Sequence, residues 1–204
     1  MTGSQDDQPL IEACRAGDAQ AFGELVRRHK DRLYAMLLRM TGCAEDAQDR
    51  LQDAFLLAFE KLDRFEGESS FYTWLYRIAV NVALSHRRKR RGPIRLSEVR
   101  PDGRPELSRD AEQSDPSLPL QRAERDALIQ SALNALAPDH RAVVVLKEFD
   151  GLRYEEVAAI LGVPVGTVRS RLHRARQELR ERLRGVVEEA DKSRPEPSTS
   201  ARTR

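Results

Sequence analysis

The C-terminal part of the sequence has a dense run of arginines on a stretch with helical spacing. Seven arginines and only two acidic residues lie between Pro164 and Arg184. Guanidinium groups bind phosphate oxygens and can donate paired hydrogen bonds to a guanine edge. Most of these arginines have no acidic neighbour, so the pattern favours nucleic-acid binding over its alternative, a solvated helix laced with salt bridges.

The residues around this run have the pattern of a helix-turn-helix. A short helix over Tyr154–Leu161 would end at Gly162, which can take a left-handed conformation, and Pro164 suits the first turn of the next helix. Arg153 stands where a capping Ser or Thr is expected, so only the Glu156 half of a capping box is present. The second helix would bury Val168, Leu172, Ala175 and Leu179 and expose Gly166, Ser170, His173 and Gln177, with Arg169 and Arg174 on the shoulders. Small polar and basic side chains near the start of an exposed helix predict major-groove reading.

Two other stretches are strongly charged, although the net charge of the chain is only +2. Residues 44–68 contain eight acidic and three basic residues, and residues 86–91 read His-Arg-Arg-Lys-Arg-Arg. Either stretch could be an ordinary solvated surface. Together, one acidic and two basic surfaces indicate at least two kinds of partner.

Motifs for enzymatic chemistry are missing from the sequence. It contains no P-loop, HExxH, CxxC or nucleophile elbow, and Cys14 and Cys43 form no disulfide framework or zinc site. His173 has no second ligand arranged beside it. We therefore predict no enzyme activity, metal or cofactor. The polar N-terminus and the lack of any run of about 20 apolar residues argue against a secretory signal or membrane span, and predict a cytoplasmic protein.

Apolar residues recur at intervals of three and four, which predicts an all-α protein. Only Val143–Val145 could instead be a strand. Residues 92–119 hold five of the ten prolines and no apolar period, which is typical of a flexible linker. We expect a helical domain over 1–91, a linker over 92–119, a helix-turn-helix domain over 120–185 and a disordered tail over 186–204.

Three strings together resemble a known family. They are residues 46–55 (DAQDRLQDAF), residues 65–81 (FEGESSFYTWLYRIAVN) followed by the basic block, and residues 166–172 (GTVRSRL). In this order and spacing they resemble the bacterial sigma factors of RNA polymerase, in the two-domain extracytoplasmic-function (ECF) branch of the sigma-70 family. The resemblance covers about residues 10–91 and 120–184.

The resemblance implies roles for residues of the first domain. The helix over 46–55 would bind the clamp helices of the largest subunit of core RNA polymerase, and the loop over 65–70 would capture a flipped base of the −10 promoter element. Asn81 would read that base, and Phe65 is either the apolar wall of the base pocket or plain core. The implied polymerase-binding residues are Asp46, Asp49, Gln52 and Asp53, and the implied −10 residues are Phe65, Asn81, Arg87, Arg88 and Arg90, the arginines gripping phosphates beside Lys89 and Arg91.

The resemblance also assigns the second domain to the −35 element and to the flap of the second-largest subunit. Its implied −35 residues are Lys147, Thr167, Arg169, Ser170, Arg171, His173 and Arg174. Arg171 lies nearer the buried flank, so we expect it to hold the DNA backbone. Arg50 replaces a usual apolar residue and Ser85 a usual Asp. An anti-sigma factor is a further expected partner.

These expectations combine into an alternative sigma factor that binds core polymerase, recognises both promoter elements and promotes melting for transcription initiation. One rival is a helix-turn-helix transcriptional regulator that is not a polymerase subunit. It would explain residues 153–180 but not the acidic helix and the string over 65–81. The other rival is a nucleic-acid enzyme that uses the acidic residues over 45–68.

Overall fold

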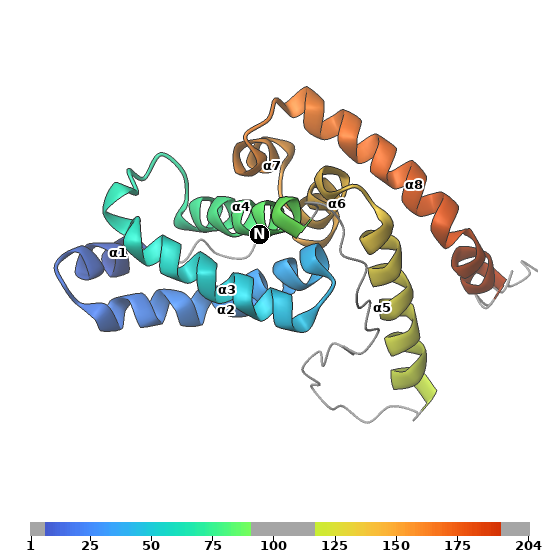
Figure 1. Cartoon of the computed structure of the whole chain (residues 1–204), viewed down its shortest axis with the longest axis horizontal. Coiled ribbons are helices and arrows are strands. Elements are labelled where there is room, and N and C mark those ends of the chain that lie inside the picture. The colour runs from blue at the N-terminus through green and yellow to red at the C-terminus, as the bar shows by residue number, and fades with distance from the viewer. Residues whose placement is uncertain (1–6, 91–116, 193–204) are drawn as a thin grey trace, which may run out of the picture.

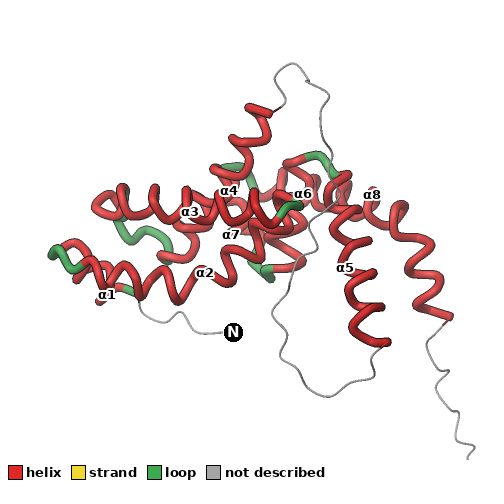
Figure 2. Tube along the Cα trace, turned by 60° about the horizontal axis from the view of Figure 1, so that its bottom comes forward, coloured by secondary structure: helices red, strands yellow, loops and turns green. Residues whose placement is uncertain are grey.

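A computed structural model describes residues 7–90 and 117–192, and these residues form helices joined by short loops (Figures 1 and 2). No strand occurs in these two ranges, so the all-α prediction is confirmed and Val143–Val145 is helical. The first range contains α1 (Gln8–Arg15), α2 (Ala19–Thr41), α3 (Ala44–Glu60), the short 3₁₀ helix η1 (Leu62–Arg64) and α4 (Phe71–Arg90). The second contains α5 (Ser117–Ala135), α6 (Pro138–Val144), the π-helical turn η2 (Val145–Phe149), α7 (Tyr154–Leu161) and α8 (Val165–Lys192).

Local sequence signals set the ends of the helices. The Asp18 carboxylate caps α2 by accepting a hydrogen bond of 2.8 Å from the Gln20 N–H. Gly42 ends α2 with φ +79° and Gly162 ends α7 with φ +64°, in the left-handed region that favours glycine. Glu156 accepts a hydrogen bond of 2.6 Å from the Arg153 N–H. The Arg153 side chain has only donors, so it cannot accept a hydrogen bond from the Glu156 N–H. The capping box is therefore half formed, as predicted.

Two differences from the expected boundaries concern helix ends. Helix α5 begins at Ser117, inside the stretch expected to be linker, and α8 continues to Lys192, inside the stretch expected to be tail. Proline at the third position of α5 lies within the first turn, where a helix needs no N–H from it. The rest of the expected linker and tail lies outside the described residues.

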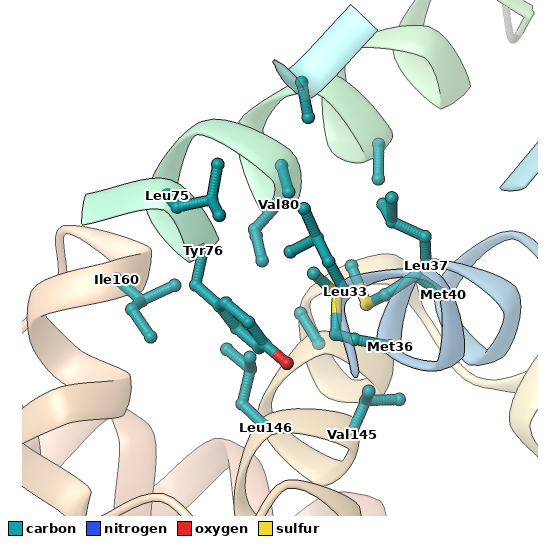
Figure 3. Close-up of a cluster of buried hydrophobic side chains, with 14 of the residues drawn as sticks. Leu33, Met36, Leu37, Met40, Leu75, Tyr76, Val80, Val145, Leu146 and Ile160 are labelled. Atoms are coloured by element: carbon teal, nitrogen blue, oxygen red, sulfur yellow. The ribbon is translucent and has the colours of Figure 1, made fainter. Parts of the chain in front are cut away.

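The first half of the chain packs α2, α3 and α4 together with α1 across one end, and the second half packs α6, α7 and α8 with α5 alongside (Figure 1). The two halves also pack on each other, which the sequence did not predict. Helix α4 contacts α7, and α2 contacts α5, α6 and η2. One continuous cluster of buried side chains therefore runs through both halves (Figure 3). None of the helices in the described ranges is both long and apolar enough to cross a membrane.

Candidate nucleic-acid interface

Helix α8 presents the face that the sequence predicted. Val168, Leu172 and Ala175 are buried on one side. Four of the predicted −35 residues are exposed on the other side, namely Arg169, Ser170, His173 and Arg174. The Ser170 hydroxyl donates to the Thr167 carbonyl at 3.0 Å, which fixes its orientation and leaves its lone pairs free to accept. This half of the site is a rigid helix face with donors and an acceptor pointing outward.

Tyr154 joins the two helices of the motif through cation–π contacts. The Lys147 ammonium lies 4.8 Å and the Arg169 guanidinium 5.5 Å from the centroid of its ring. Lys147 also donates to the Leu152 carbonyl at 2.9 Å. The two cations come from η2 and α8, so the ring of Tyr154 keeps predicted DNA contacts from different elements close together. Sequence reasoning missed Tyr154 because it was counted only as the start of α7.

Arg171 is already engaged within the protein. Its Nη2 lies 2.8 Å from Oδ2 of Asp139, and its side chain is 28% exposed. Arg176 pairs likewise with Glu148, with Nε at 3.0 Å from Oε1. These pairs join α8 to α6 and η2. The position of Arg171 agrees with the expectation that it lies near the buried flank, whereas Arg174 has a more open position on the exposed face.

Helix α4 carries the predicted −10 residues at different places. Asn81 is exposed, and Arg77 and Ser85 are exposed one turn to either side of it, so the three form a stripe. Arg77 was missed, although its spacing from Asn81 in the sequence would have revealed it. The basic side chains of Arg87, Arg88 and Arg90 follow on α4, but they lie outside the described side chains.

Phe65 belongs to the core. It is only 6% exposed, and its ring lies 5.8 Å from Phe71 and 5.3 Å from Trp74 between centroids. Arg15 further holds this segment by donating to the carbonyls of Leu62 and Phe65. Asn81 lies about 15 Å along the helix axis from Phe71. The structure therefore does not bring Phe65 and Asn81 together. It places Phe65 in the core and not in the wall of a pocket beside Asn81.

The acidic face of α3 is exposed but partly neutralised. Asp49 and Gln52 are exposed, and Asp46 and Asp53 are half-buried. The Arg50 guanidinium lies 3.1 Å from Asp53 and 3.8 Å from Asp49. The predicted polymerase-binding residues thus share one helix face, and Arg50 reduces its negative charge.

An apolar residue at the C-terminal end of this face was missed. Leu56 is 62% exposed, and it lies one turn from Gln52 and Asp53. It also borders a shallow groove of about 390 Å³ between α3 and α4. Arg50 and Ser85, the two departures from the family pattern, line the same groove. In the sequence, Leu56 falls outside the buried stripe of its helix. That position could have identified it as an exposed apolar residue.

Comparisons with known proteins agree with this arrangement. Residues 25–92 match the family described as Sigma-70 region 2, and residues 126–179 match Sigma-70, region 4. The chain is 37% identical over 195 residues to the RNA polymerase sigma-H factor of Pseudomonas aeruginosa, covering 93% of this chain and 100% of that one. It is 36% identical over 190 residues to the ECF RNA polymerase sigma-E factor of Escherichia coli K12, covering 92% and 99%.

Among solved structures, the sigma factor RpoE of Bartonella quintana, in complex with the anti-sigma factor NepR, matches with a TM-score of 0.62 and 28% identity. The match covers 81% of this chain and 98% of that one. Matches along nearly the full length of sigma factors would not arise for a regulator that shares only a helix-turn-helix, nor for a nuclease. The chain belongs to the ECF branch of the sigma-70 family, and so is a non-catalytic RNA polymerase subunit of transcription initiation.

Proposed function

We propose that the exposed face of α8 reads the −35 element of the promoter in the major groove. Arg169, Ser170, His173 and Arg174 point outward there and contact base edges, with Arg174 as the principal base-reading residue. Lys147, Thr167 and Arg171 lie at its margins and hold the phosphate backbone. The single observation that supports this role best is the division of α8 into a buried apolar face and an exposed basic face.

The α4 stripe then engages the −10 element. Asn81 hydrogen-bonds a base on the displaced strand, and Arg77 binds a neighbouring phosphate. Arg87, Arg88 and Arg90, which follow in the sequence, bind further phosphates. Phe65 contributes indirectly, because its packing on Phe71 and Trp74 fixes the start of the loop over 65–70. Extruding a base costs a few kcal/mol, so trapping it drives melting without a nucleotide fuel.

The acidic face of α3 docks on the clamp helices of the largest polymerase subunit. Asp46, Asp49, Gln52 and Asp53 provide its polar contacts, and Leu56 adds an exposed apolar contact at one end. The second half docks on the flap of the second-largest subunit. An anti-sigma factor regulates the chain by covering these surfaces, and the chain works in the cytoplasm. Two weakly binding halves gain affinity because one chain tethers them.

Reconstituted transcription tests the proposal. The purified chain should bind core polymerase and produce run-off transcripts from its own promoter without another sigma factor. The Arg174→Ala variant provides a matched control, because it should assemble with core normally and lose preference for the −35 sequence. Core binding without any transcript, or transcripts that ignore the −35 sequence in both proteins, would contradict the proposal.

A further inference from the structure

Two arginines flank the exposed face of α8 that we assign to base reading. At about 100° per residue, Arg171 lies about 100° to one side of Ser170 and Arg176 about 120° to the other. A helix in the major groove has a phosphate backbone on each side of it, and side chains at its flanks reach those phosphates. Arg171 and Arg176 are therefore placed to meet the two backbones, while the residues between them meet the base edges.

Each flanking arginine is paired with a carboxylate from another element. Nη2 of Arg171 lies 2.8 Å from Oδ2 of Asp139 on α6, and Arg176 donates from Nε to Oε1 of Glu148 on η2 at 3.0 Å. The Asp139 side chain is 47% exposed and the Glu148 side chain is 41% exposed, so these pairs add little to the stability of the fold. Their stronger effect is electrostatic, because each pair neutralises a cation beside the groove before DNA arrives.

The cations on the reading face, by contrast, keep their charge. Among the residues that the structure describes, Arg174 is exposed and forms no ion pair. Arg169 contacts the ring of Tyr154, and a cation–π contact leaves the charge of the guanidinium in place. The pairing is thus selective, since it neutralises the two arginines that flank the face and leaves the two on the face charged.

We propose that Asp139 and Glu148 compete with DNA phosphates for Arg171 and Arg176, and so lower the sequence-independent affinity of the chain for DNA. This inference rests on the proposed function, because the flanking arginines meet phosphates only if α8 lies in the major groove. A phosphate that approaches either arginine also approaches its carboxylate, and the repulsion offsets much of the attraction. The base contacts of Arg174 are unaffected.

The consequence is that one promoter element alone holds the chain weakly. Phosphate contacts supply most of the affinity of a protein for DNA of any sequence, and two of the available contacts are weakened here. Stable binding then depends on both halves of the chain reaching their elements, since tethered sites add their affinities. The two carboxylates would in this way make recognition depend on a complete promoter.

Isosteric substitutions in the full-length chain test the proposal. Asp139→Asn and Glu148→Gln remove one charge each and keep the side-chain shape. Fluorescence anisotropy would measure binding to a −35 duplex and to a random duplex of equal length over a range of salt concentrations. Asp126→Asn is the matched control, because Asp126 is an exposed carboxylate of the same half that lies on α5, outside the elements that hold the two pairs. Thermal unfolding of each variant would show whether the fold is intact.

Each substitution should raise the affinity for both duplexes about twofold to fivefold, the effect expected of one exposed charge pair, and the two together about fourfold to 25-fold. The slope of log affinity against log salt should steepen by about 0.9 per substitution, the value for one more phosphate contact. Adding Arg171→Ala to Asp139→Asn should cancel the gain, because the carboxylate acts through that arginine. The Asp126→Asn control should stay within about 1.5-fold of the parent chain.

Three results would overturn the proposal. A loss of affinity in Asp139→Asn and Glu148→Gln would show that the carboxylates orient the arginines for DNA instead of competing with it. A gain confined to the −35 duplex would place them in base reading, and an equal gain in Asp126→Asn would assign the effect to net charge. Equal binding of the −35 and random duplexes by the parent chain and all variants would instead count against the proposed function.

Discussion

The Arg50 guanidinium lies 3.1 Å from the Asp53 carboxylate on the exposed face of α3. It also approaches Asp49, and its Nε is buried without a hydrogen-bond partner. The carboxylates of both pairs remain partly open to water, so these ion pairs add little stability. Its main effect is to lower the negative charge of the surface that we assign to polymerase binding.

Asp49→Arg should weaken binding to core polymerase, because it adds a second cation to that surface. The residue is exposed, so the fold should be unaffected. Fluorescence anisotropy with labelled chain would give the dissociation constant for core, and we expect an increase of at least fivefold. The affinity of the same variant for a −35 duplex is the control. Equal core affinity for the variant and the parent chain would remove this face of α3 from the interface.

Arg174→Ala should cost about 1–3 kcal/mol of binding to the cognate −35 element if the contact is bidentate, and much less on mismatched DNA. Competition assays on single-base variants of the element measure this difference. Arg180→Ala is a suitable comparison, since Arg180 is also exposed on α8 but lies outside the predicted reading positions. An unchanged ranking of −35 sequences would refute base reading by Arg174.

Asn81→Ala should impair promoter opening more than initial binding, because its partner is an extruded base. Permanganate reactivity of unpaired thymines reports opening, and gel shifts on closed complexes report binding. A promoter with a pre-melted −10 region should restore part of the lost activity if the defect lies in capturing the base after extrusion. Equal losses in binding and opening would count against base capture.

Tyr154→Leu should reduce −35 binding about 5- to 30-fold, because two cation–π contacts of about 0.5–1 kcal/mol each would be lost. Tyr154→Phe keeps the ring and should restore most of the affinity. The fall should diminish in Lys147→Ala and Arg169→Ala backgrounds, which lack one of the two cations. Equal effects of the Leu and Phe substitutions would show that the ring does not position these cations.

Lower pH should favour packing of the two halves of the chain on each other (the closed form) over their separation (the open form). Burial between the two halves raises the pKa of Asp150 to about 6 from 3.8, although Arg32 and Arg39 lower it. In the open form, with an ordinary pKa, the carboxyl takes up its proton only at lower pH. Closing therefore binds a proton between about pH 4 and pH 6, and the closed fraction rises as pH falls.

We expect the closing equilibrium to shift about tenfold between pH 7.5 and pH 5. Energy transfer between dyes at Lys30→Cys and Glu181→Cys, in the background without native cysteines, would measure it. Tyr72 and Tyr76 face Asp150 from α4, and burial raises the pKa of both, so neither titrates in this range. Asp150→Asn should abolish the shift, and a shift of the same size in that variant would assign it to other groups.

The sequence predicted the helices well, because their buried faces follow the helical period and glycines mark their ends. Gly162 ends α7 as expected, and Gly42 ends α2 in the same way. The face of α8 followed from the same period. For Phe65, by contrast, the sequence pattern is the same for a core residue and for a residue of a pocket wall. Its ring contacts with Phe71 and Trp74 place it in the core.

The packing of the two halves on each other could not be predicted from periodicity. Arg141 looks like a surface residue of a short helix in the sequence, but its partner Met40 is distant in the chain. Tyr154 and Leu56 were missed for a related reason. Their roles depend on which side chains surround them in space, and a helical pattern describes only the element on which each residue lies.

The continuous core also bears on how long a copy of this protein survives. Packing of the two halves on each other covers apolar surfaces of both, with Val145 and Leu146 in the same buried cluster as residues of α2 and α4. A chain whose two halves stay separated would expose those surfaces to chaperones and proteases, which act on exposed apolar segments. The lifetime of a chain would then depend on whether its two halves pack together again. Chains that fail to do so would be degraded first.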